Sequence, residues 1–181
     1  MLPLNFELED GRTVEIVQLN KKISTKAILN FINQIIEENL YITYDKKVTL
    51  AQEEKWKKEK LEIIKNNEAI ILFAVCNKKV VASLEARRER GKMRENVCCG
   101  IVIAKDFRGA GLGEYILQLL IKEAKRKLKP KNIYLIVFAE NKPAIALYKK
   151  LGFTKLLARY PKWLKHKGKY IDQLVLLLVD K

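Results

Sequence analysis

The chain has 181 residues, 49% of them apolar, and a formal charge of +15. This length and apolar content fit one folded domain over residues 1–181 and exclude a disordered polymer. No run reaches about 18 uninterrupted apolar residues, so no transmembrane helix is expected. The first residues lack the basic start and apolar run of an export signal, so the expected location is the cytoplasm.

The positive charge has two interpretations. An anionic partner, such as a nucleic acid or a phosphate-bearing cofactor, would be attracted to it. The lysines are spread over both ends and the middle of the chain, which favours a solvated, lysine-rich surface. Nucleic acid is then expected to bind only through non-specific charge. The abundance of lysine, glutamate and isoleucine also fits a protein from a thermophile.

The chain offers few residues for metal or thiol chemistry. The cysteines are Cys76, Cys98 and Cys99, and none lies in a metal-binding spacing. Their odd number favours reduced thiols, and Cys76, at the end of an apolar run, is expected in the core. The one histidine, His166, lies in KWLKHKGKY and is expected to be a solvated loop residue. With one histidine, no metal site is expected.

The first third of the chain predicts one strand and two helices. Arg12–Leu19 is the predicted strand. A helix follows, with Ser24 or Thr25 as its cap, because one helical face is apolar at Ile28, Phe31, Ile32, Ile35, Ile36 and Leu40. Glu38–Val48 is predicted to be a loop. Thr49 and Gln52 have the spacing of a capping box, so the second helix begins there.

The remainder predicts strands alternating with two further helices. The predicted strands are Ala69–Cys76, Val80–Arg87, Val97–Ile103, Ile133–Ala139, Phe153–Arg159 and Ile171–Val179. The first two of these are expected to form a hairpin. The helices are Leu112–Lys127, stopped by Pro130, and Asn141–Leu151, followed by Gly152. This order predicts a mixed sheet with helices packed on it, in the α/β or α+β class.

The stretch RGAGLG, Arg108–Gly113, lies between a predicted strand and a predicted helix. Backbone N–H groups of such a turn and of the helix start converge on one spot, where the helix dipole adds positive charge. Glycine lets an anion approach the backbone, and Arg108 adds a forked cation. The stretch therefore predicts a phosphate site. It is neither a P-loop nor a dinucleotide fingerprint, because the sixth positions from Gly109 and Gly111 are Glu114 and Ile116.

A second motif, NKPAIALYKKLGF, spans Asn141–Phe153. Taken alone, its aliphatic residues would be a core stripe. The pair R-x-x-G-x-G and N-x-x-A-x-x-L-Y-x-x-L-G-F, separated by a helix and a strand, resembles the GCN5-related N-acetyltransferase (GNAT) superfamily over Ala69–Val179. The resemblance implies the GNAT fold, a mixed sheet of six to seven strands with helices on both faces. It also implies transfer of the acetyl group of acetyl-CoA to an amine.

The resemblance assigns the residues that bind acetyl-CoA. The CoA pyrophosphate is expected on the backbone of Arg108, Gly109, Ala110, Gly111, Leu112, Gly113 and Glu114. The pantetheine arm is expected to pair with Ile101, Val102 and Ile103, where two parallel strands splay apart. Asn141, Ala144 and Tyr148 of the second motif are also expected to contact it. An N–H group near Val102 or Ile103 would bind the oxyanion of the tetrahedral intermediate.

The resemblance also implies catalytic roles. Tyr148 matches the tyrosine that protonates the departing thiolate. In relatives, a glutamate that acts as general base occupies one of two positions, which in this chain are Ile136 and Cys98. Glu85 is therefore the candidate general base, with an exposed structural glutamate or a water chain as alternatives. Cys98 as an acyl-accepting nucleophile is a further alternative.

The acceptor is expected to be a protein or peptide amine, either an N-terminus or a lysine. The segments Glu38–Val48 and Tyr160–Tyr170 correspond to loops that border the acceptor site in the family, and their aromatic residues are Tyr41, Tyr44, Tyr160 and Trp163. Their mostly basic character counts against polyamines. A small-molecule amine is the alternative within this class, and a non-catalytic acyl-CoA or nucleic-acid binding protein is the alternative outside it. Either a monomer or a homodimer is expected.

Overall fold

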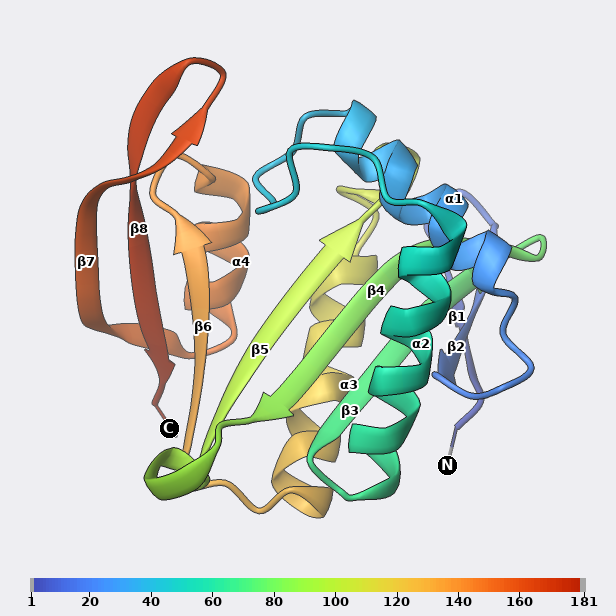
Figure 1. The fold of residues 1–181 in the computed structure, drawn as a ribbon, viewed down its shortest axis with the longest axis horizontal. Coiled ribbons are helices and arrows are strands. Elements are labelled where there is room, and N and C mark those ends of the chain that lie inside the picture. Colours follow the sequence, from blue (N-terminus) through green and yellow to red (C-terminus); the bar gives the residue numbers. More distant parts are fainter. Residues whose placement is uncertain (1, 180–181) are drawn as a thin grey trace.

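The computed structural model describes residues 2–179 (Figure 1). The helices are α1 (Thr25–Glu37), α2 (Leu50–Lys65), α3 (Leu112–Lys127) and α4 (Lys142–Lys150). The strands are β1 (Leu4–Glu7), β2 (Thr13–Gln18), β3 (Ala69–Cys76), β4 (Lys79–Arg88), β5 (Asn96–Ile103), β6 (Asn132–Phe138), β7 (Phe153–His166) and β8 (Lys169–Leu178). Each predicted helix and strand is present. Leu112–Lys127 and Ala69–Cys76 have the predicted bounds, and the ends of the other elements are shifted. No helix of the described residues is long and apolar enough to cross a membrane.

The strands form one mixed sheet in the order β1-β2-β3-β4-β5-β6-β8-β7. Only β5 and β6 pair in parallel, and the other neighbours are antiparallel. The fold class is as predicted, although the sheet has eight strands and not six to seven. The additional strand is β1, a four-residue edge strand. Its Phe6 stacks on Tyr115 of α3, with ring centroids 4.4 Å apart.

The segment Tyr160–Tyr170 was predicted to be a loop, and this prediction is wrong. Here β7 continues to His166 and turns at Lys167 and Gly168 into β8. Most of its side chains are exposed, so the segment lacks the buried-exposed alternation that identifies a strand in a sequence. Irregular pairing between Tyr160 and Leu164 weakens the pattern further.

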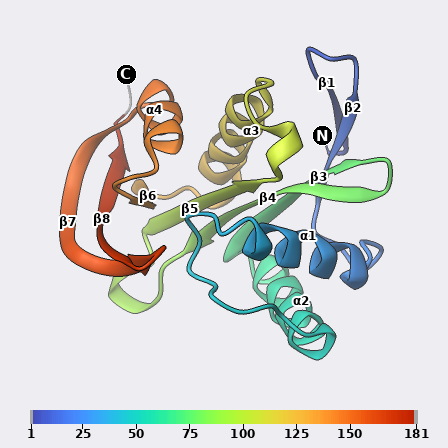
Figure 2. The same cartoon turned by 90° about the horizontal axis from the view of Figure 1, so that it is seen from above.

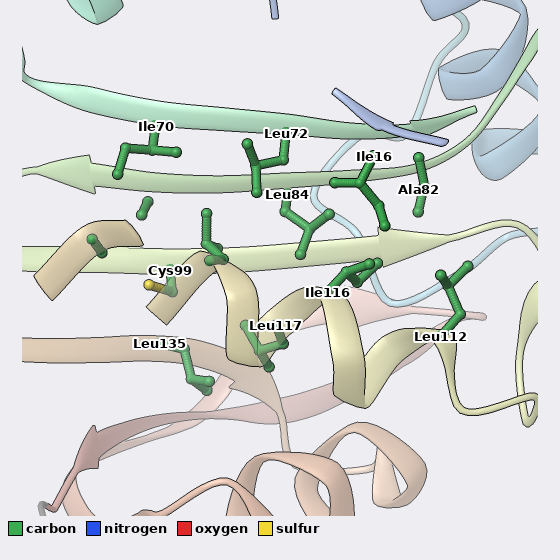
Figure 3. Close-up of a cluster of buried hydrophobic side chains, with 14 of the residues drawn as sticks. Ile16, Ile70, Leu72, Ala82, Leu84, Cys99, Leu112, Ile116, Leu117 and Leu135 are labelled. Atoms are coloured by element: carbon green, nitrogen blue, oxygen red, sulfur yellow. The ribbon is translucent and has the colours of Figure 1, made fainter. Parts of the chain in front are cut away.

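Two helices cover each face of the sheet, as predicted (Figure 2). On one face, α3 and α4 pack on side chains from the central strands, and Figure 3 shows Ile116 of α3 beside Leu84 and Leu117 beside Leu135. On the other face, α1 and α2 cover a second cluster that includes Phe73. Cys76 lies in the first core, as expected. The two cores fix the sheet between both helix pairs.

The start of each helix has a local cause. Ser24 caps α1 through the N–H of Ala27, and Thr49 with Gln52 forms the predicted capping box of α2. Helix α3 begins after Gly111, which has left-handed backbone angles. Asn141 caps α4. The capped starts of α3 and α4 both border the region described next.

Candidate active site

The two parallel strands separate halfway along their length. Pairing of β5 with β6 ends at Cys99 and Leu135, although both strands continue (Figure 1). A cavity of about 560 Å³ opens there. Its walls come from β5, the glycine stretch, α4 and the loop after α1, through Ile101, Val102, Ile103, Arg108, Gly109, Gly111, Gly113, Glu114, Asn141, Pro143, Ala144, Leu147, Tyr148, Leu40, Tyr41 and Ile42.

The backbone of β5 presents hydrogen-bonding groups to this cavity. The N–H of Ala104 bonds to the carbonyl oxygen of Val81 on β4. Because backbone groups alternate in direction along a strand, the N–H of Val102 also faces β4, whereas those of Ile101 and Ile103 face the gap. Of the two N–H groups expected to bind the oxyanion, that of Ile103 faces the cavity and that of Val102 does not. The N–H of Ile101 also faces the cavity and is a second possible donor.

The glycine stretch has the geometry of an anion site. Gly109 and Gly111 have φ values of 78° and 76°, a conformation that residues with a Cβ rarely adopt. Glycine is required at position 113 for lack of space and not for its backbone angles, because a Cβ there would lie 3.0 Å from Ile103 Cδ1. Since α3 begins at Leu112, the N–H groups of its first turn lack helical partners beside the cavity.

Two of the expected cofactor residues do not line the cavity. The Leu112 side chain is fully buried under the sheet, and Ala110 packs against the same core. Leu112 can therefore contact a ligand in the cavity only through its backbone.

Arg108 is engaged by the protein itself. Its Nε donates to the carbonyl oxygen of Ile103 at 2.8 Å, and its guanidinium pairs with Glu38. Arg108 thus connects the glycine stretch to the loop after α1, and a phosphate would have to share or replace Glu38. Glu114 would repel an anion at the start of α3, but Lys150 neutralises it at 2.5 Å.

Helix α4 supplies the remaining wall. Asn141 Oδ1 accepts from the N–H of Ala144 at 3.3 Å, so this residue caps the helix and lines the cavity. Tyr148 is 6% exposed and packs edge-on against Phe153. Burial, and then the nearby Cys99, raises the pKa of Tyr148 to about 12. Its hydroxyl therefore stays protonated near neutral pH.

The two thiols on β5 are poor nucleophiles. Burial raises the pKa of Cys98 to about 11, and burial raises the pKa of Cys99 further. The reactive form of cysteine is the thiolate, which is scarce at such values. Covalent catalysis by Cys98 is therefore disfavoured.

Glu85, the sequence candidate for the general base, lies on β4 opposite Gly100. Its Oε1 is 2.6 Å from Lys60 Nζ and 3.9 Å from Arg87 Nε. It does not line the cavity. The other two positions considered for a base, Ile136 and Cys98, carry no carboxylate, and Ile136 is exposed on β6.

His166 was predicted to be a solvated loop residue, and this prediction is wrong. It is 9% exposed at the end of β7, with its ring centroid 4.5 Å from that of Tyr41 and 6.2 Å from that of Phe138. The strand places Lys165 on its exposed face and His166 on the opposite one. The β7–β8 hairpin thereby contacts the loop after α1 beside the cavity, while Tyr160 and Trp163 pair on its exposed surface.

Several cavity residues have no individual signal in the sequence. Leu40, Ile42 and Pro143 line it through their position beside motif residues, whereas Leu147 is a residue of the second motif for which no role was predicted. Leu40 was assigned to the first helix, but α1 ends at Glu37. Among residues 2–179 no group of three or more histidine, cysteine, aspartate or glutamate side chains has the arrangement to hold a metal ion.

Comparisons with known proteins agree on one family. The family model described as "Acetyltransferase (GNAT) family" matches residues 30–153. An N-alpha-acetyltransferase of Sulfurisphaera tokodaii is 32% identical over 111 residues, which cover 55% of the chain and 66% of that protein. The chain thus matches less than two thirds of that relative's length.

Solved structures share the fold. Ribosomal-protein-alanine N-acetyltransferase from Brucella melitensis has a TM-score of 0.76 at 24% identity, covering 91% of this chain and 99% of the other. The acetyltransferase yncA from Salmonella typhimurium, solved with acetyl-CoA, has a TM-score of 0.77 at 22% identity, covering 91% and 92%. With a family model that matches more than half of its residues, the chain belongs to the acetyltransferase (GNAT) family.

Proposed function

We propose that the protein is an acetyl-CoA-dependent N-acetyltransferase that acetylates an amine of a protein or peptide. The observation that carries the proposal is a single cavity joining three features. These are an unpaired strand edge, a glycine stretch at a helix start, and a buried tyrosine. Together they suit a long ligand with amides, phosphates and a thioester.

The donor side of the cavity fits acetyl-CoA by its chemistry. The N–H groups around Gly109 to Gly113 and the start of α3 would bind the pyrophosphate. Of the outward N–H groups of Ile101 and Ile103, one would pair with an amide of the pantetheine arm, which leaves the other for the oxyanion. The apolar surfaces of Leu147 and Ala144 would cover its alkyl parts.

The chemistry follows from that placement. The neutral amine attacks the thioester carbonyl, the C–S bond breaks, and CoA leaves as a thiolate, whose thiol has a pKa of about 8.5. The amine nitrogen loses one N–H proton to solvent, which gives the neutral amide. With its pKa near 12, Tyr148 would stabilise this thiolate mainly by hydrogen-bond donation, because complete proton transfer is uphill. Ile103 N–H would donate to the oxyanion. Holding amine and thioester together supplies much of the rate gain.

The protein surface beside the cavity favours a peptide acceptor over a polyamine. Residues 153–171, which cover the β7–β8 turn, contain no aspartate or glutamate. Asp172, the next residue, pairs with Arg159, and the other exposed cations of the segment are Lys155, Lys162, Lys165, Lys167 and Lys169. A polycation would be repelled by this surface, and a peptide with acidic residues after its reactive amine would be attracted. The name of the Sulfurisphaera tokodaii relative, an N-alpha-acetyltransferase, supports the same class.

Calorimetry with acetyl-CoA tests the donor side. We expect wild-type protein and Tyr148→Phe to bind acetyl-CoA with similar affinity, because the hydroxyl acts on the thiolate, which forms only during reaction. We expect the variant to transfer acetyl groups roughly 10- to 100-fold more slowly. Absence of acetyl-CoA binding by the wild-type protein would refute the proposal.

A further inference from the structure

The glycine stretch is held in place by few hydrogen bonds of its own backbone. Among residues 2–179, the N–H groups from Gly109 to Glu114 donate to no backbone carbonyl oxygen. The first bond of this kind runs from the N–H of Tyr115 to the carbonyl oxygen of Gly111, at 3.3 Å. Free N–H groups suit an anion-binding wall, but they do not fix the shape of the backbone. The shape of the stretch must therefore depend on contacts from other segments.

One of these segments is the N-terminal hairpin, formed by β1, β2 and the turn between them. It lies at one edge of the sheet, on the side that carries α3 (Figure 2). Nη2 of Arg12, in its turn, donates to the carbonyl oxygen of Asp106 at 2.8 Å. The guanidinium carbon of Arg12 also lies 4.2 Å from the ring centroid of Phe107, a cation–π contact. Since Asp106 and Phe107 directly precede Arg108, Arg12 holds the segment that enters the glycine stretch.

The direction of the Arg12 side chain is fixed within the hairpin turn. Oδ2 of Asp10 accepts from Nε of Arg12 at 2.8 Å and lies 2.6 Å from its Nη2. Oδ1 of Asp10 accepts from the backbone N–H of Arg12 at 3.1 Å. The turn is closed by a bond from the N–H of Leu8 to the carbonyl oxygen of Arg12. A planar guanidinium that is bound along its edge and on its face keeps one orientation.

The hairpin also contacts the far end of the glycine stretch. Phe6 of β1, which stacks on Tyr115 of α3, does so with an angle of 21° between the ring planes. Its Cζ lies 3.9 Å from the point that a Cβ of Gly111 would occupy. Neither Phe6 nor Arg12 lines the cavity. Contact with a ligand there must therefore be made through the glycine stretch, and not by these two side chains.

Resting on the proposed acetyltransferase activity, we propose that Arg12 and Phe6 are positioning residues for the binding of the acetyl-CoA phosphates. They support the two ends of the glycine stretch from outside the cavity and hold its free N–H groups in the arrangement that binds the pyrophosphate. The family model begins at residue 30, so the N-terminal hairpin lies outside the residues that it matches. The proposal thus adds a segment to the donor site that neither motif contains.

Attraction between the charge of Arg12 and the phosphates is the competing explanation. This charge is already paired with Asp10, and the Arg12 side chain is 35% exposed, so salt screens it. The two explanations differ in their dependence on salt. A misplaced glycine stretch weakens phosphate binding at any salt concentration, whereas the loss of a distant charge matters little at high salt.

The test uses two acetyl donors, acetyl-CoA and S-acetylpantetheine, which lacks the phosphates. For Arg12→Gln we expect the KM for acetyl-CoA to rise about 10-fold. We expect kcat to change less than about 2-fold, because Arg12 touches no residue that faces the thioester. With S-acetylpantetheine, kcat/KM should equal that of the wild-type protein. The ratio of the variant and wild-type KM values for acetyl-CoA should persist at about 0.5 M salt.

Two further variants complete the design. Lys22→Gln is the matched control, because it removes one exposed positive charge shortly after β2 and should behave as wild type with both donors. Phe6→Leu keeps an apolar side chain behind Gly111 but removes the ring. It should raise the KM for acetyl-CoA several-fold and leave S-acetylpantetheine unaffected. If Arg12→Gln does not fold, Phe6→Leu decides the question by the same comparison.

An equal loss with both donors would overturn the assignment, because the defect would then not concern the phosphates. A defect that disappears at high salt, or a wild-type KM for acetyl-CoA in both Arg12→Gln and Phe6→Leu, would overturn it too. If the wild-type protein bound no acetyl-CoA and released no CoA with any acceptor, the proposed function itself would fail. The wild-type measurements separate that case from a failure confined to the N-terminal hairpin.

Discussion

Glycines 109, 111 and 113 serve two different purposes. The first two adopt left-handed backbone angles in the wall of the cavity, and the third provides space beside Ile103. The spacing in the sequence predicted a phosphate site but did not distinguish these reasons, because φ values and side-chain contacts depend on the folded chain. All three glycines line the same wall of the cavity.

Gly111→Ala tests the backbone purpose. We expect it to lower the free energy of unfolding by about 1–2 kcal/mol, because alanine is strained at positive φ, and to weaken acetyl-CoA binding. Gly111→Asn is the control and should be milder, since asparagine tolerates this conformation. Chemical denaturation measures both. Equal losses for the two variants would contradict the explanation.

At the scale of elements, the sequence predicted the bounds of a helix or strand best where several signals coincide. Helix α3 was predicted with its observed bounds, because apolar spacing, the glycine start and Pro130 agree. The end of β7 was missed because its exposed side chains carry no periodic signal. His166 was misassigned for the same reason, since its burial comes from Tyr41 on a distant segment.

An ion pair on α3 makes stability depend on pH. Hydrogen bonds from Arg126 and Lys127 lower the pKa of Glu123 to about 2. A lowered carboxyl pKa stabilises the fold above the unfolded value, near 4.5, and this contribution is lost as pH falls toward 2. At pH 7, Glu123→Gln should lose about 1 kcal/mol, since the exposed Arg126 is screened by solvent.

The difference between Glu123→Gln and wild type should shrink when unfolding is measured below about pH 4. Glu62→Gln is the control, because its contact with Lys65 is 4.0 Å long and exposed. A difference that stays constant with pH would show that Glu123 acts through packing and not through its charge.

At the scale of the whole molecule, three contacts hold the loop after α1 over the cavity. Arg108 pairs with Glu38, Asn33 bonds to the backbone of Val48, and Tyr41 packs on His166. Each contact joins two segments that are separated in the sequence, and no sequence motif predicts it. The family motifs pointed to the cavity residues of β5, the glycine stretch and α4. The part of the cavity wall formed by the loop after α1 depends on these three contacts, which no sequence motif marks.

The charge of +15 should attract the phosphates of acetyl-CoA. We expect acetyl-CoA affinity to fall several-fold between about 0.05 M and 0.5 M salt, because screening shortens the reach of exposed charges. Uncharged pantetheine should show little change. Titration calorimetry at both salt concentrations compares the two ligands, and an equal salt dependence would contradict the role of the positive surface.

The central claim is transfer of acetyl groups from acetyl-CoA to a peptide amine. Release of the CoA thiol, followed with peptides, lysine-containing proteins, polyamines and aminoglycosides, tests it most directly. We predict release with peptide amines, most with acidic residues after the amine, and a slower rate with Tyr148→Phe. Release only with polyamines or aminoglycosides, or no release above the hydrolysis rate with any acceptor, would contradict the claim.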